Sequence, residues 1–78
     1  MNDLIYLEKH DEKQNLHRFY RLLVEADLFG KWVLTREWGR VGQSGGHIAV
    51  EQYEARESAH QDMDKKAQEK LKRGYRII

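Results

Sequence analysis

The sequence predicts an α+β fold, in which a small antiparallel β-sheet of about four strands carries one C-terminal helix packed across one face. Three observations predict it. Segments of strand composition recur through the first two thirds of the chain, a glycine-rich connection joins the last two of them, and the apolar period then changes to that of a helix. The chain has 78 residues, no proline and no linker-like segment, so we expect a single domain over residues 1–78.

Two strands are expected in the N-terminal part of the chain. Residues 4–9, LIYLEK, are rich in apolar and β-branched side chains and predict a short first strand. After a polar loop, residues 17–26, HRFYRLLVEA, predict a second strand with apolar side chains of both parities. Residues 27–30, DLFG, are expected to form a loop. That loop leaves Leu28 and Phe29 either folded back on the core or exposed.

A β-hairpin follows. Residues 31–38, KWVLTREW, and residues 47–53, HIAVEQY, have strand composition. Between them, residues 37–46, EWGRVGQSGG, contain four of the six glycines in the chain, so the loop should be longer than two residues. Glycine contributes no side chain to packing, so four glycines in one stretch need a reason. Either they serve the turn alone, or they also make room for a ligand.

The C-terminal segment predicts an amphipathic helix. One apolar residue recurs at every fourth position and marks its buried stripe: Ala59, Met63, Ala67 and Leu71. The helix begins either at a capping box from Ser58 to Gln61 or nearer Ala55. Gly74 stands where a C-cap is expected, and the lysines before it suit the negative end of the helix dipole.

The net charge of +1 conceals a segregation of charge along the chain. Acidic side chains outnumber basic ones in residues 1–12 and 51–64, and basic ones prevail in residues 31–40 and 65–76. Taken alone, each run is most often a solvated face. Composition therefore does not by itself predict a nucleic-acid partner.

Several classes of function find no support in the sequence. The chain has no cysteine, its four histidines fall in different segments without paired ligand spacing, and its serines lack a nucleophile signature. The glycine-rich stretch lacks the lysine and the following helix of a nucleotide-binding loop. We therefore expect no catalytic residue, no metal site and no cofactor, and a protein that is not an enzyme.

The N-terminal residues do not have the pattern of a signal peptide, and no segment is apolar enough to span a membrane. Small secreted domains usually need disulfides, which this chain cannot form. We therefore expect a cytoplasmic protein without membrane contact.

Trp38 and Arg40 are the residues whose spacing suggests binding. On an extended chain they project from the same face about 6.5–7 Å apart, so an indole and a guanidinium can engage a base or sugar and its neighbouring phosphate together. Gly39 between them would let a ligand backbone approach closely. Alternatively, Trp38 is a core residue, because Trp32 and Leu34 share its parity unless a bulge intervenes.

The sequence resembles the WGR domain family, named for its Trp-Gly-Arg tripeptide. Residues 36–46, REWGRVGQSGG, match its signature, and residues 15–42 resemble the stand-alone bacterial branch with its LFG loop. Residues 69–75, EKLKRGY, resemble the closing helix of the family, and the glutamine often found past the second turn is His47 here. The resemblance covers roughly residues 15–77.

The resemblance implies both a fold and a function. In eukaryotic poly(ADP-ribose) polymerases, similar domains bind DNA near strand breaks and help relay that event to a catalytic domain. Carried over, Trp38 would pack on nucleic acid and Arg40 would contribute to nucleic-acid or inter-domain contacts, with Gly39 permitting the approach. Basic residues near the end of the helix, here Lys70 and Lys72, would also face nucleic acid.

Our leading hypothesis is a non-catalytic module that binds nucleic acid, DNA in preference to RNA, including strand ends or breaks. Trp38 would stack, Arg40, Arg36 and Lys31 would contact phosphate, and the helix end over residues 65–73 would widen the positive field.

The alternative hypothesis is a protein-interaction or regulatory module that uses the open sheet face or the loop with Leu28 and Phe29. Its partner would be a separately encoded protein or a second copy of the chain. The protein itself would then be a monomer or a weak dimer.

Overall fold

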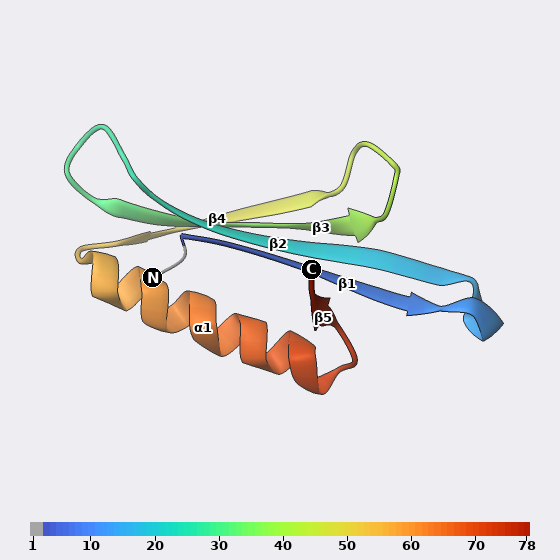
Figure 1. Ribbon diagram of the computed structural model, residues 1–78. Coiled ribbons are helices and arrows are strands. Elements are labelled where there is room, and N and C mark those ends of the chain that lie inside the picture. The colour runs from blue at the N-terminus through green and yellow to red at the C-terminus, as the bar shows by residue number, and fades with distance from the viewer. Residues whose placement is uncertain (1–2) are drawn as a thin grey trace.

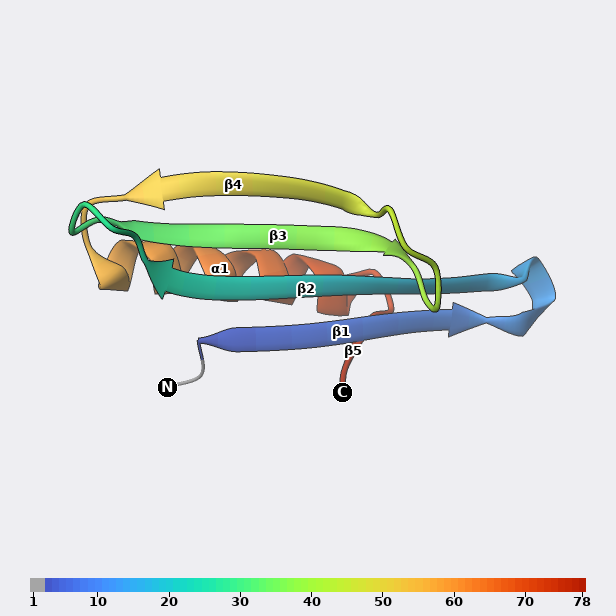
Figure 2. The same cartoon turned by 90° about the horizontal axis from the view of Figure 1, so that it is seen from above.

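Five antiparallel strands and one helix make up residues 3–78, the part of the chain that the computed structural model describes (Figure 1). The elements are β1 (Leu4–Asp11), the 3₁₀ turn η1 (Glu12–Gln14), β2 (Leu16–Ala26), β3 (Trp32–Arg40), β4 (His47–Tyr53), α1 (Arg56–Lys72) and β5 (Arg76–Ile77). The strands lie in the order β4-β3-β2-β1-β5, and Figure 2 shows the first four side by side with the helix beneath. The predicted α+β class is confirmed.

The sheet differs from the prediction in one added strand and in the ends of the predicted strands. A fifth strand, β5, pairs with β1 opposite Leu7 and Glu8. Two residues are too few to show a periodic pattern. This strand forms only because the chain returns to β1 after the helix. Strands β1 and β3 each continue two residues beyond the predicted end, β1 to Asp11 and β3 through Gly39 to Arg40.

The helix ends follow one prediction and contradict another. Its N-cap is Ala55, without a side-chain cap, so the capping box from Ser58 to Gln61 is wrong and the earlier start is confirmed. At the other end, Gly74 adopts φ of 94°, which favours glycine, and its N–H donates to the carbonyl of Leu71 at 3.1 Å. Within residues 3–78 there is no helix long and apolar enough to cross a membrane.

The hydrophobic core lies between the sheet and the helix. From the helix come Ala59, Met63 and Ala67, all buried as the apolar stripe predicts, with Leu71 packed beside them. The buried sheet residues on this face are Leu7, Tyr20, Leu22, Val24 and Leu34. No described element covers the opposite face of the sheet.

The loop between β2 and β3 resolves the choice left open for its two apolar residues. Leu28 and Phe29 are exposed rather than folded back, with 97% and 85% of their surface accessible. One carboxylate oxygen of Asp27 accepts hydrogen bonds from the N–H groups of Phe29 and Lys31, at 2.8 and 2.9 Å. The turn is thus held by its own polar contacts.

Candidate nucleic-acid interface

A row of rings crosses the helix-side face of the sheet, beside the end of α1. The strand register places Tyr20 opposite Trp38 and Trp38 opposite His47. The Tyr20 and Trp38 centroids are 6.0 Å apart, those of Trp38 and His47 are 5.6 Å apart, and both pairs are nearly parallel. Tyr75, just after the helix, meets Tyr20 edge-on at 6.4 Å.

Trp38 lies between the two arrangements that the sequence left open for it, a buried core residue and an exposed one. It is half-buried and packs against the core, and β3 keeps a continuous register with β2 from Trp32 to Arg40 without a bulge. Trp38 therefore shares a face with Trp32 and Leu34, as parity predicts. Because Tyr20 and His47 flank the indole, it presents mainly its outer edge to a ligand.

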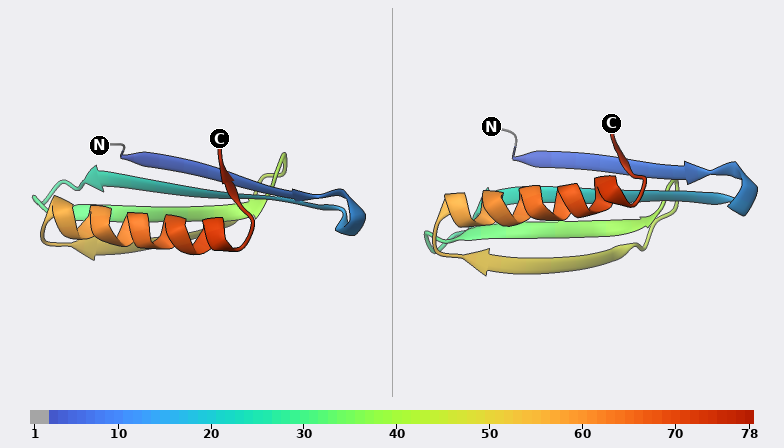
Figure 3. Two further views of the ribbon diagram at one scale, coloured as in Figure 1. Left: turned by 60° about the horizontal axis from the view of Figure 1, so that its bottom comes forward. Right: turned by 90° about the horizontal axis from the view of Figure 1, so that it is seen from below.

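A groove of about 720 Å³ lies beside this row. Figure 3 shows that β1 and β2 run past the last turn of the helix at this end of the sheet. The walls of the groove come from the β1–β2 turn, the start of β2, the end of β3, the start of β4, the helix end and Tyr75. The lining residues are Gln14, Asn15, Leu16, His17, Arg18, Phe19, Trp38, Gly39, Arg40, His47, Lys70 and Tyr75. They include three cationic side chains and no carboxylate.

The three cations of the groove have no ion-pair partner among residues 3–78. Arg18 and Arg40 stand directly opposite each other on neighbouring strands, a placement in which like charges repel. The ammonium of Lys70 lies 4.6 Å from the centroid of Tyr20 and 5.4 Å from that of Tyr75. Burial lowers the pKa of Lys70, and the nearby charge of Arg73 lowers it further. An anion in the groove would relieve this repulsion.

A family model for the WGR domain matches residues 4–78. The chain is also 36% identical, over 72 residues, to the uncharacterized protein y4dW of Sinorhizobium fredii (strain NBRC 101917 / NGR234). The chain belongs to the WGR domain family. The match covers 92% of this chain but 35% of that relative, so the chain spans about a third of the relative's length.

WGR domains are non-catalytic modules that bind nucleic acid in poly(ADP-ribose) polymerases. Within residues 3–78 of this WGR domain, no three histidine or carboxylate side chains gather as a metal ion would need.

The structure brings together only some of the predicted site residues of the WGR domain. Trp38, Gly39, Arg40 and Lys70 line the groove. Lys72 is exposed on the last turn of the helix, outside the groove.

The other two predicted cations are already paired. Lys31 lies just before the first residue of β3, about 30 Å along the strand from Arg40, and pairs there with Glu54. Arg36 lies behind the rings, pairs with Glu51 at 3.1 Å, and donates a hydrogen bond to the hydroxyl of Tyr20 at 3.4 Å.

Sequence reasoning missed eight residues of this groove, among them the cationic or ring-bearing side chains of His17, Arg18, His47 and Tyr75. Arg18 carries a usable signal, because its parity in HRFYR matches that of Tyr20, and a hairpin through residues 27–31 sets it opposite Arg40. Tyr75 could not be placed, since its position depends on where the helix ends.

The glycines of the hairpin have reasons within the WGR domain itself. A Cβ at Gly39 would lie 3.2 Å from the Cα of Gly46 and 3.3 Å from the Phe19 ring, so the space it leaves is already occupied. A Cβ at Gly46 would lie 2.6 Å from the carbonyl oxygen of Trp38. The turn geometry and these close approaches account for the glycine-rich stretch.

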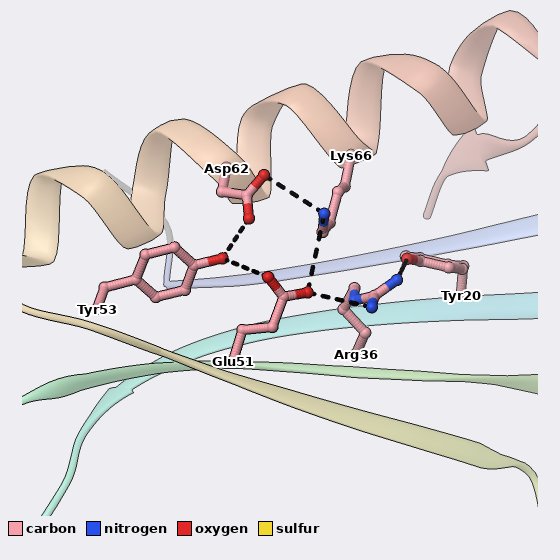
Figure 4. A network of polar contacts seen from close by, with 6 residues as sticks. All are labelled: Tyr20, Arg36, Glu51, Tyr53, Asp62 and Lys66. Atoms are coloured by element: carbon pink, nitrogen blue, oxygen red, sulfur yellow. Dashed lines mark hydrogen bonds and ion pairs between the residues drawn. The ribbon is translucent and has the colours of Figure 1, made fainter.

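A polar network links the helix to the row of rings (Figure 4). The hydroxyl of Tyr53 is hydrogen-bonded to the carboxylates of Asp62 and Glu51, and Lys66 lies 3.4 Å from Asp62. Glu51 in turn pairs with Arg36, whose guanidinium carbon lies 5.6 Å from the indole centroid of Trp38. The network therefore fixes the position of Arg36, which contacts both Tyr20 and Trp38.

The network shifts the pKa values of several of its members, among them Tyr53 and Asp62. Burial raises the pKa of Tyr53, and its hydrogen bonds to Asp62 and Glu51 raise it further. The hydrogen bond from Tyr53 holds the pKa of Asp62 below its ordinary value, and the charge of Lys66 acts in the same direction. The Asp62 carboxylate thus stabilises the fold fully above about pH 4 and loses that contribution as the pH falls through its lowered pKa.

We expect Tyr53→Phe to lower the free energy of unfolding by about 1–2 kcal/mol at neutral pH, because the partly buried carboxylates of Asp62 and Glu51 lose the hydroxyl proton that they share. The loss of stability on acidification below about pH 4 should also become smaller. Urea denaturation at neutral pH and at about pH 3 measures both effects.

Tyr6→Phe is the matched control for this variant. Tyr6 donates to Glu8 at 2.7 Å on the open face of the sheet, where water can replace the hydroxyl, so we expect a loss of a few tenths of a kcal/mol. Equal losses in the two variants would contradict a special role for the network.

Proposed function

We propose that this WGR domain is a non-catalytic nucleic-acid-binding module whose binding surface is the groove at the end of the helix. One observation carries the proposal: Arg18, Arg40 and Lys70 converge beside a row of rings without a carboxylate partner among the described residues. A fold tolerates such repulsion more readily where a ligand supplies the opposite charge. Phosphate is the anion that suits guanidinium groups next to aromatic rings.

The arrangement suggests how a strand would be held. The two guanidiniums and the ammonium of Lys70 would contact phosphates. The outer edge of Trp38 and the ring of His47 would contact a sugar or a base at a strand end. No base-reading element enters a groove of the nucleic acid in this arrangement, so we expect weak sequence preference and strong dependence on salt. We further propose DNA as the preferred nucleic acid.

Trp38→Leu should weaken binding up to about tenfold, since contact with the indole edge is worth at most the lower part of the about 1–3 kcal/mol of a stacked base. Fluorescence anisotropy with single-stranded, blunt, nicked and 5′-phosphorylated probes, of DNA and of RNA, measures the affinity at two salt concentrations. Each variant is first shown to be folded by circular dichroism.

Trp32→Leu is the matched control, because Trp32 shares the face and strand of Trp38 but lies at the far end, near Arg56. It should leave affinity unchanged. The proposal is overturned if no probe binds at low salt, or if the two tryptophan variants lose affinity equally.

A further inference from the structure

The two edges of the sheet are protected unequally. On one side, β5 pairs with β1 and Ile78 donates a further hydrogen bond to the carbonyl of Tyr6 at 3.0 Å. On the other side β4 is hydrogen-bonded only to β3 among the described elements. Figure 3 shows the helix lying over the inner strands, with β4 beyond it. The free edge of a sheet is a template for pairing with another strand.

The alternation of the ladder identifies which backbone groups of β4 face outward. The β2–β3 ladder bonds residues of odd number, as the flanking bonds from Val41 N–H to the His17 carbonyl and from Asp27 N–H to the Lys31 carbonyl indicate. Even-numbered residues of β3 therefore bond β4 through its odd-numbered residues. This leaves the N–H and C=O groups of Ile48, Val50 and Gln52 directed away from the sheet.

The side chains along this edge do not block pairing. Native sheets usually protect an edge with proline, lysine or a bulge, and β4 has none of these. Ile48 and Val50 instead project from the open face with 62% and 60% of their surface accessible. The three outward-directed residues carry no charge.

We propose that β4 pairs antiparallel with β4 of a second copy of this chain, about a two-fold axis at Val50. Val50 is the middle residue of β4, so this register overlaps the whole strand. Three pairs of outward-directed residues would then exchange about six backbone hydrogen bonds. Two valines would meet at the axis on the open face, with Ile48 opposite Gln52 of the second copy.

The charges of the strand are complementary to themselves in this register. Glu51 faces Ala49 of the second copy, and His47 faces Tyr53, so no two like charges stand opposite each other. Glu51 is already neutralised by Arg36 and Lys66 at 3.1 and 3.9 Å. A second copy therefore fits the free edge without a charge conflict.

The pairing would also organise the proposed binding surface, a consequence that rests on the proposed function. A two-fold axis perpendicular to the sheet keeps both helices, and both grooves, on one face of a continuous sheet. A long nucleic acid could then contact both grooves, which raises avidity without a new contact.

The test measures mass without nucleic acid, so it is independent of the proposed function. In sedimentation equilibrium, the weight-average mass should rise from 9.3 kDa toward twice that value between about 10 µM and about 1 mM protein. In amide NMR spectra recorded over the same range, the changes should centre on Ile48, Val50 and Gln52. A monomer mass at every concentration would overturn the proposal.

Opposite charges at the axis test the register. Val50→Asp and Val50→Lys each place like charges opposite one another, so each variant alone should remain monomeric. An equimolar mixture of the two should associate again. Phe29→Asp, a charge at an exposed apolar site in the β2–β3 turn, should associate like the wild type. Association of either Val50 variant alone at wild-type strength, or a mixture that stays monomeric, would exclude this register.

Discussion

Gly46→Ala should lower the free energy of unfolding of this WGR domain by about 2–3 kcal/mol. The added Cβ would lie 2.6 Å from the carbonyl oxygen and 3.3 Å from the carbonyl carbon of Trp38. Both are backbone atoms that cannot move without displacing the hairpin. A chain of 78 residues has a total stability of about 4–12 kcal/mol, so the loss is a large part of it. Thermal unfolding should show a fall in Tm of about 10–20 °C.

Gly42→Ala is the control for this substitution. Gly42 has φ of 82°, and nothing lies within 4 Å of where its Cβ would be, so only the backbone strain is added. We expect a loss of about 1 kcal/mol. If Gly46→Ala costs no more than Gly42→Ala, the hairpin relaxes freely and the close approach to Trp38 does not constrain it.

The parts of the fold that could be predicted are those that depend on the local sequence pattern. The four long strands follow from their apolar and β-branched composition, and the helical stripe from Ala59 to Leu71 follows from its four-residue period. Neither pattern needs knowledge of distant contacts. The helix start could not be fixed, because Ala55 caps it without a side-chain bond. Strand β5 was missed because only its pairing with β1 makes two residues a strand.

The candidate site was predictable along β3 but not across the sheet. Trp38 and Arg40 share a face because strand geometry alone requires it. Proximity in sequence was misleading for Lys31, which the same strand carries to the far end of the sheet. Arg36 shares the face as well, but the pairing of β3 with β4 brings it to Glu51. Arg18 enters the groove only through the register of the β2–β3 hairpin.

The second large effect is expected at Arg18 and Arg40, which the register of β2 and β3 places opposite each other. The double variant Arg18→Gln with Arg40→Gln should bind nucleic acid about 100-fold more weakly, since each charge-assisted contact is worth about 1.5 kcal/mol or more. The slope of log K against log salt should become shallower by about 2, because two fewer counterions are released. Anisotropy titrations across a salt series measure both quantities.

The same double variant should be no less stable than the wild type, and more stable by up to about 1 kcal/mol, because a like-charge pair across β2 and β3 is removed. Lys31→Gln and Lys72→Gln, singly and combined, serve as controls, since together they remove the same charge outside the groove. Each should change affinity by less than about twofold. Affinity that falls equally in all these variants would indicate attraction by net charge alone. Affinity lost only with Arg18 and Arg40, in a fold that gains stability, would mean that the repulsion between them is retained for a ligand.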